Sequence, residues 1–303
     1  MEFRVLQYFL AVAREQSISG AAESLHLTQP TLSTQLKALE AELGKQLLVR
    51  GTPGSRKVTL TEEGRILRKR AEEILSLVQK AESEIALSGQ AIAGDVRIGA
   101  GETDSIRLLA QAARDLQKEC PDIHYHIFSG NSVFVLEQLD RGLIDFGLIY
   151  SSVDASRYES IEFPIRDTFG VLMRRDAPLA QKESIAPEDL WDKPLIVSRQ
   201  EARDGWPLSA WMKRDASRLK IVATYNLLFN GSLLVDEGVG YAICFDKLIN
   251  TTGHSNLCFR PLEPALLSSP RIVWKKYQIF SKAAEKFLAT LQSRIRTLQE
   301  GKS

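Results

Sequence analysis

One stretch, residues 17–43, constrains the fold of this chain most, because it predicts two short helices joined by a tight turn. Within the second helix, leucines recur at steps of four, three and four residues. At about 100° per residue they form one narrow stripe that can face a core. The stripe consists of Leu32, Leu36, Leu39 and Leu43.

Local signals place the ends of this second helix and its neighbour. Thr28 stands where an N-cap is needed, and Pro30 falls in the first turn, where its missing N–H costs nothing. Gly44 supplies a natural end. In the preceding helix, Ala21 and Ala22 are small enough to let the two helices cross closely, as a helix-turn-helix requires.

The face opposite the leucine stripe carries short polar groups and one cation rather than the Glu/Lys ladder of an ordinary solvated helix. Such a face suits a DNA groove, where a recognition helix presents side chains to the bases. A plain helical hairpin in an all-α core has the same periodicity and stays an alternative at this point. The residues of this face are Pro30, Thr31, Ser33, Thr34 and Lys37.

Residues 47–61 predict a β-hairpin, because two β-prone pieces flank the turn residues 52–55. A hairpin beside a helix-turn-helix is a wing. Arg50, Arg56 and Lys57 lie on or next to it, where cations can reach phosphates or a narrow minor groove. The alternative is that they are ordinary surface cations.

Residues 61–88 form a long predicted helix with a heptad seam between charged flanks. Such a seam favours a partner helix, and a pair of these helices would hold two DNA-binding units at a fixed separation. Packing of the helix on its own chain remains the alternative. The seam consists of Leu67, Ala71, Ile74, Val78, Ala81 and Ile85.

Composition limits the function classes. The 303 residues include 39 Lys+Arg and 38 Asp+Glu, so any DNA contact must be local rather than due to a global basic field. No apolar run reaches the length of a membrane span, and the N-terminus lacks a signal-peptide pattern. Three scattered cysteines argue against a disulfide framework. We therefore expect a cytoplasmic protein with no membrane partner.

Beyond residues 88–94, which we interpret as a linker, strands alternate with helices. Successive βαβ units predict a parallel sheet with helices on both faces, in two α/β halves with a ligand cleft between them. The predicted domains are 1–60, 61–88 and 89–303. The last divides into one half of 94–163 and 269–303 and a second half of 164–268.

Cofactor and metal motifs are weak. Gly99 and Gly101 follow a strand, but Asp104 replaces the third glycine of a dinucleotide fingerprint, and Glu102 adds negative charge where a pyrophosphate would sit. His124 and His126 share one strand face without a third metal ligand nearby in sequence. We therefore expect no cofactor, no metal and no catalytic group.

Loops at the carboxyl ends of strands are the better ligand candidates, because hydroxyls, amides and charges suit a small polar molecule. The alternative is that they are solvated loop tips and helix caps, with Asp104 and Ser132 as N-caps. The loops are 101–104, 129–132, 150–152 and 198–203, which contain the candidates Gly101, Glu102, Asp104, Ser198 and Arg203.

The chain resembles the LysR-type transcriptional regulators over essentially its whole length, and most strongly over the first sixty or so residues. The resemblance rests on Ser19, Ala21, Ala22, Leu25, Leu27-Thr28-Gln29-Pro30, Ser33, Gln35, Leu39-Glu40, Leu43-Gly44, Leu47, Arg50, Val58, Leu60-Thr61 and Gly64. Looser matches follow at Gly94, Ile98-Gly99, Gly130-Asn131-Ser132, Leu139, Gly142, Asp145, Val235, Gly238 and Gly240.

This resemblance implies a winged helix-turn-helix, a dimerising linker helix and an effector-binding domain similar to type 2 periplasmic binding proteins. It implies a homodimer, usually assembled into a tetramer, on double-stranded promoter DNA, with a small-molecule effector between two subdomains. By position, the groove-facing set becomes Gln29, Pro30, Thr31, Ser33, Thr34 and Lys37. The implied effector residues are Thr103, Asn131, Ser132, Tyr150 and Arg199.

Departures from the family pattern limit what carries over. Thr34 stands where arginine is frequent and Thr31 where alanine is frequent, so base preference does not transfer. Leu48 replaces a frequent phenylalanine, and the wing is about three residues longer than usual by the same resemblance. Acidic and basic candidates in the cleft suggest an effector that carries both charge types, or an amine.

The sequence thus predicts a DNA-binding transcriptional regulator controlled by a small effector. Two rivals remain. One is an α/β ligand-binding or enzymatic module whose N-terminal helices only dimerise. The other is an architectural DNA binder, which predicts equal affinity for operator and random DNA.

Overall fold

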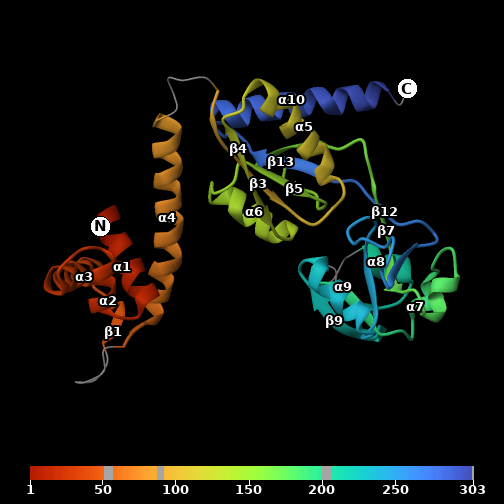
Figure 1. Cartoon of the computed structure of the whole chain (residues 1–303), viewed down its shortest axis with the longest axis horizontal. Coiled ribbons are helices and arrows are strands. Elements are labelled where there is room, and N and C mark those ends of the chain that lie inside the picture. The colour runs from red at the N-terminus through yellow and green to blue at the C-terminus, as the bar shows by residue number, and fades with distance from the viewer. Residues whose placement is uncertain (51–56, 87–91, 200–206, 302–303) are drawn as a thin grey trace. The chain divides into compact units, whose positions relative to one another are not determined.

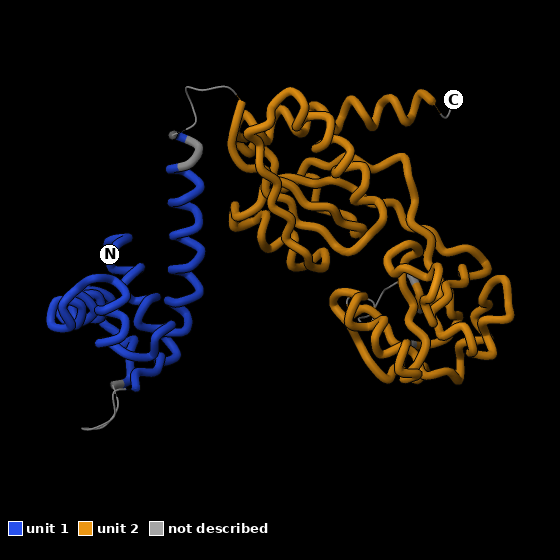
Figure 2. The backbone as a smooth tube through the Cα atoms, viewed as in Figure 1, with its two compact units in different colours: residues 1–88 blue, residues 89–303 orange. Residues whose placement is uncertain are grey.

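The computed structural model describes residues 1–50, 57–86, 92–199 and 207–301. The chain forms two compact units, Met1–Ser88 and Gly89–Ser303. Figure 2 shows them in two colours. Among the described helices, none is both long enough and apolar enough to cross a membrane.

The first unit is a helical core with a small hairpin (Figure 1). Three leucines of the predicted stripe, Leu32, Leu36 and Leu39, are buried against the other helices. Leu43 is 40% exposed, because α3 ends there and Gly44 turns the chain with a φ of 62°. The elements are α1 (Phe3–Glu15), α2 (Ile18–Ser24), α3 (Gln29–Leu43), β1 (Leu48–Arg50), β2 (Val58–Leu60) and α4 (Glu62–Ala86).

The hairpin is attached to the helices by hydrogen bonds. Strands β1 and β2 pair antiparallel, with Leu48 opposite Leu60. The Glu40 carboxylate of α3 accepts from the backbone N–H of Leu47 at 2.8 Å and of Leu48 at 3.0 Å. The Val58 N–H donates to the carbonyl oxygen that follows α1. The predicted turn 52–55 lies outside the described residues.

Helix α4 divides its seam between two environments. Ala71 is fully buried and Leu67 packs against the core of the first unit. Further along the seam, Ile85 is 74% exposed, and Leu77, which lies beside the seam, is 40% exposed. The first half of the helix thus packs on its own chain, which was the alternative to a partner helix. The second half leaves apolar side chains in solvent.

The second unit contains two sheets, and the first has the strand order β4-β3-β5-β13-β6. The predicted parallel arrangement is confirmed for β3, β4 and β5. The prediction missed that β13 pairs antiparallel with β5 and that β6 in turn pairs antiparallel with β13. The strands are β3 (Gly94–Ala100), β4 (Ile123–Ser129), β5 (Phe146–Ile149), β6 (Tyr158–Glu162) and β13 (Arg271–Lys275).

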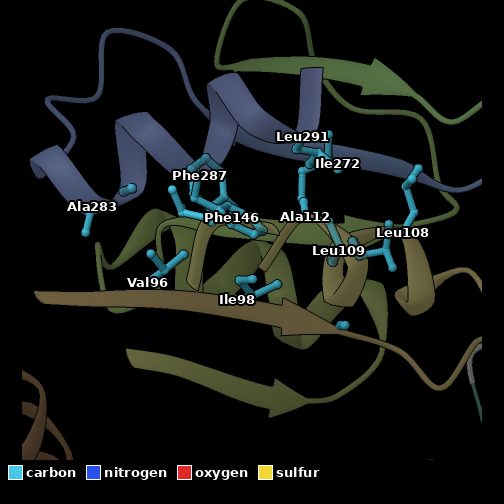
Figure 3. Close-up of a cluster of buried hydrophobic side chains, with 14 of the residues drawn as sticks. Val96, Ile98, Leu108, Leu109, Ala112, Phe146, Ile272, Ala283, Phe287 and Leu291 are labelled. Atoms are coloured by element: carbon cyan, nitrogen blue, oxygen red, sulfur yellow. The ribbon is translucent and has the colours of Figure 1, made fainter. Parts of the chain in front are cut away.

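Helices cover both faces of this sheet (Figure 1). On one face, α5 (Ile106–Glu119) and α10 (Lys282–Glu300) bury a core around Phe146 and Phe287, shown in Figure 3. On the other face lies α6 (Ser132–Asp140).

Glycines in the sheet allow α6 to pack closely. A Cβ on Gly147 would lie 2.5 Å from Val135 Cγ1, and one on Gly99 would lie 2.7 Å from Ile144 Cδ1. Both distances are too short for real contacts. Gly99, which suggested part of a dinucleotide fingerprint, is therefore accounted for by close packing against Ile144, which follows α6, and against Val135 of α6.

The second sheet is also mixed, with the order β11-β7-β10-β8-β9 and β12 paired to β7. Its strands are β7 (Asp167–Arg174), β8 (Leu195–Ser198), β9 (Ile221–Tyr225), β10 (Tyr241–Phe245), β11 (Leu257–Pro261) and β12 (Leu267–Ser268). Its helical pieces are η1 (Pro178–Gln181), α7 (Pro187–Leu190), α8 (Pro207–Met212), η2 (Ala216–Arg218) and α9 (Leu228–Asp236). The chain passes between the sheets at residues 163–166 and 269–270.

Candidate functional site

The outer face of α3 presents the polar side chains that the sequence placed there. Ser33 is half-buried, whereas the others are exposed. The Thr28 hydroxyl caps the helix by accepting from the Thr31 N–H at 3.4 Å. The exposed residues are Gln29, Pro30, Thr31, Thr34 and Lys37.

One hydroxyl of this face is already oriented. Thr34 donates to the Pro30 carbonyl oxygen at 2.9 Å, so its oxygen is left to accept from a partner. Lys37 lies one turn further on and offers three donors with a positive charge. A hydroxyl acceptor beside a cation suits a base edge next to a phosphate.

The wing is only partly described. Lys57 is exposed just before β2, and the backbone of Arg50 ends β1. The predicted contact of Arg56 lies outside the described residues.

A second candidate site is a cavity of about 460 Å³ between the two sheets of the second unit. Six of the predicted residues line it: Gly101, Glu102, Asn131, Ser132, Tyr150 and Ser198. The remaining lining residues are Gly130, Leu148, Ser151, Ser152, Phe169, Tyr225, Asn226, Leu228, Cys244, Phe245, Leu248 and Ser268.

Three predicted residues do not line this cavity. Thr103 is buried and bonded to Asp167, and Asp104 forms an ion pair with Arg107 at 2.6 Å. Arg199 is exposed. It continues the strand pairing after Ser198, and successive residues of a strand point to opposite faces. Arg203 lies outside the described residues.

The alternative of simple helix caps is wrong for both residues it named. Asn131, not Ser132, is the N-cap of α6 and accepts from the Phe134 N–H at 3.0 Å. At α5 the N-cap position is Ser105, which makes no side-chain cap, so Asp104 does not fill that role.

Glu102 crosses the cavity to the second sheet's side. Its carboxylate accepts from the backbone N–H of Leu228, the first residue of α9. The N-cap position of α9, Leu227, has no side chain that could do so. Glu102 therefore supplies the negative group that the N-terminus of this helix favours.

A buried carboxylate joins the two sheets behind the cavity. Asp167, at the start of β7, accepts from Thr103 Oγ1 at 2.9 Å and from Ser105 Oγ at 2.6 Å. The Tyr150 hydroxyl also bonds to it. Burial of Tyr150, followed by the charge of Asp167, raises the pKa of this phenol far above its usual value.

Aromatic rings form part of the cavity wall. Phe245 lies 4.7 Å from Tyr150 and 4.3 Å from Phe169, measured between ring centroids. Sequence analysis predicted Tyr150 but missed Phe169 and Phe245, because nothing local marks them. Asn226 could have been found, since it follows the carboxyl end of β9 as the other candidates follow their strands.

The weaker chemical motifs are also placed. His126 lies 3.1 Å from Asp95 on an exposed strand. Within the described ranges, no group of three or more His, Cys, Asp or Glu side chains could hold a metal ion. The three cysteines are buried and none of them forms a disulfide, and Cys244 lies within β10.

Comparison with known proteins decides the family. The family model "Bacterial regulatory helix-turn-helix protein, lysR family" matches residues 3–65, and "LysR substrate binding domain" matches residues 89–296. The chain belongs to the LysR family of transcriptional regulators. The first match covers α1 to β2, and the second covers the two sheets and their cavity.

Individual relatives match from two thirds of the chain to nearly all of it. The uncharacterised regulator YfeR of Shigella flexneri is 26% identical over 98% of this chain and 95% of its own length. The regulator AlsR of Bacillus subtilis is 32% identical over 68% of this chain and 66% of its own length. The crystal structure of full-length CbnR with its target DNA has a TM-score of 0.77 at 20% identity, covering 98% of this chain and 99% of that one.

This membership excludes the rival in which the α/β part is an enzymatic module. The protein is a LysR regulator with a helix-turn-helix unit and a substrate-binding unit, not an enzyme.

Proposed function

We propose that this regulator recognises its operator through the exposed face of α3 and responds to a small molecule bound in the cavity of the second unit. The observation that carries the first part is the division of α3 into a buried leucine stripe and an exposed polar face. The proposed DNA-binding residues are Gln29, Pro30, Thr31, Ser33, Thr34, Lys37, Arg50, Arg56 and Lys57. Among these, Arg56 and the side chain of Arg50 rest on the sequence alone.

The proposed effector site keeps the six predicted residues that line the cavity. A cavity of about 460 Å³ lined by hydroxyls, amides and aromatic rings is of the size and kind that small ligands occupy. The cavity lies between two sheets that are connected by only two segments of the chain. A ligand bound there can therefore favour one distance between the two halves over another. These halves correspond to the proposed ranges 94–163 with 269–303, and 164–268.

We further propose that the protein is a homodimer and that two dimers pair into a tetramer. A dimer would bind an operator with two related half-sites. Exposed apolar side chains on α4 support the dimer, because Leu77 and Ile85 lie on a helix that could bury them against a second copy. The location that fits a bacterial promoter-binding protein is the cytoplasm, where such promoters lie.

The test is selection of genomic DNA fragments by the purified full chain, followed by sequencing. The proposal expects enrichment of a site with two related halves about one helical turn or more apart. A Thr34→Ala, Lys37→Ala double variant should lose this enrichment at matched salt.

A matched control comes from the second unit. Lys286→Ala with Thr290→Ala removes the same residue types from α10 and should leave the enrichment intact. Equal recovery of all fragments by the unaltered protein would favour the architectural rival and overturn sequence-specific recognition.

A further inference from the structure

The described lining of the cavity has an unusual charge composition. Among those lining residues Glu102 alone carries a formal charge, and no Lys, Arg or His is included. Of the two cation candidates predicted for this site, Arg199 is exposed and does not belong to the lining, and Arg203 lies outside the described residues. A ligand in this cavity therefore meets a negative group without a described basic side chain beside it.

Glu102 is held with one oxygen engaged and the other available. Its Oε2 accepts from the Leu228 N–H, and no group in the described part of the chain donates to Oε1. The N-terminus of α9, which could attract an anion, is thus already occupied by the protein's own carboxylate. A second anion placed there would have to displace Glu102 or lie against it, and like charges at that distance repel.

A second carboxylate, that of Asp167, lies next to the cavity but does not belong to its lining. Asp167 is buried and held by hydroxyl groups, one of which belongs to the lining residue Tyr150. Cations do lie near Asp167, but Arg107, Arg166 and Lys247 line a separate outer cavity rather than the cleft.

The rest of the lining is neutral and suits a cation. The rings of Tyr150, Phe245 and Phe169 form one aromatic cluster in the lining, and the face of an aromatic ring attracts cations. Side-chain oxygens that can accept from an ammonium group are distributed around the cavity. They belong to Asn131, Ser132, Ser151, Ser152, Ser198 and Asn226.

We propose that the cleft takes a ligand bearing an ammonium group, with Glu102 Oε1 as its counter-ion and the aromatic cluster beside its carbon skeleton. This inference rests on the proposed function only in taking the cavity as the effector site. It makes Glu102 a specificity-determining residue, because this side chain would bind the ligand while it accepts a hydrogen bond from the N-terminus of α9.

The test uses two matched series of probes on the full chain. One consists of 2-phenylethylamine, 2-phenylethanol and 3-phenylpropanoate, and the other of cyclohexylamine, cyclohexanol and cyclohexanecarboxylate. Binding is measured by titration calorimetry and by the ligand-dependent rise of the melting midpoint, which follows mass action. We expect at least one amine to bind, and its carboxylate analogue to bind at least about tenfold more weakly.

Variants assign the effect to Glu102. Glu102→Gln retains an amide oxygen that can accept from the Leu228 N–H, so α9 keeps its partner while the charge is lost. It should weaken amine binding about tenfold or more and change alcohol binding less than about threefold. The matched control Asp104→Asn removes a carboxylate two residues away that lies outside the cavity lining, and it should leave amine affinity unchanged.

Several outcomes would overturn the proposal: carboxylates that bind better than amines, amines that bind Glu102→Gln as well as the unaltered protein, or no amine binding at all. These outcomes leave the DNA selection untouched, because that experiment concerns residues of the first unit. A failed DNA selection would equally leave an amine-binding cavity in place.

Discussion

The exposed face of α3 and the cavity of the second unit are built in opposite ways. The residues of the α3 face lie between Gln29 and Lys37, and one helix presents them. The cavity residues come from strand ends between Gly101 and Ser268 and meet only because two sheets face each other. A surface on one helix depends on local periodicity, whereas a cavity depends on every strand that brings a loop to it.

The sharpest division on α3 is between neighbouring residues 36 and 37. Leu36→Ala should lower the free energy of unfolding of the first unit by about 2–5 kcal/mol, because the removed side chain is fully buried. Lys37→Ala should change it by less than about 0.5 kcal/mol, because its side chain is exposed. Urea denaturation followed by circular dichroism measures both. Similar losses in the two variants would mean that α3 does not separate structural from binding residues.

In the second unit, the sheet that contains β5 has little room for added side-chain volume where α6 packs on it. Gly147→Ala should cost about 1–3 kcal/mol, because the new methyl group would meet Val135 at 2.5 Å and Leu139 at 3.0 Å. Gly101→Ala is the control, since its nearest neighbour would lie 3.7 Å away. The comparison of the two unfolding midpoints checks this, and an equal shift would contradict close packing of α6.

The Asp167 cluster should make stability depend on alkaline pH. The pKa of Tyr150 is raised in the folded protein, so the unfolded chain loses this proton first, near a pH of about 10. The contribution is complete below that pH. Above it, stability should fall by about 1.4 kcal/mol per pH unit for this residue until the folded pKa is reached.

Other tyrosines act in the same direction, so the measurement is the difference between the unaltered protein and Tyr150→Phe. Burial raises the pKa of Tyr125 and of Tyr158 to about 12. Denaturation at pH 8 and at pH 11 should show a smaller loss of stability in Tyr150→Phe. An identical loss would contradict a raised pKa of Tyr150 in the folded protein.

The smallest effect is expected at Asp104, which sharpens the contrast with Glu102 in the same loop. Asp104 pairs with Arg107, whose side chain is 74% exposed, and exposed pairs contribute about 0–1 kcal/mol. Asp104→Ala should therefore shift the unfolding midpoint only slightly, which thermal denaturation can measure. A loss as large as that of a buried residue would show that this carboxylate has a structural role.

Local signals predicted the first unit well, and the exceptions have local causes. The Thr28 cap and the Gly44 end of α3 are confirmed because both depend on residues adjacent in sequence. Leu43 is exposed although it fits the stripe, because periodicity does not say where the packed core ends. The seam of α4 could not be divided between its own chain and solvent without knowing where α1 lies.

The second unit shows what sequence could not provide. The rule that ligand-binding loops follow strand ends selected Glu102, Asn131 and Tyr150 correctly as cavity residues. It did not say which side chain of a loop turns inward, and Asp104 therefore appeared equivalent to Glu102. The antiparallel pairing of β13 with β5 and β6 could not be predicted either, because β13 joins the sheet from a distant part of the chain.

The most direct test of the account is the ratio of affinities for the selected operator and for a scrambled fragment of equal length, measured at one salt concentration. The account predicts a ratio of about 10³ or more for the unaltered protein and for Lys286→Ala, Thr290→Ala. Thr34→Ala, Lys37→Ala should bring this ratio close to one while the urea midpoint stays unchanged. A ratio near one for the unaltered protein, or an undiminished ratio in the α3 variant, would contradict recognition by this face.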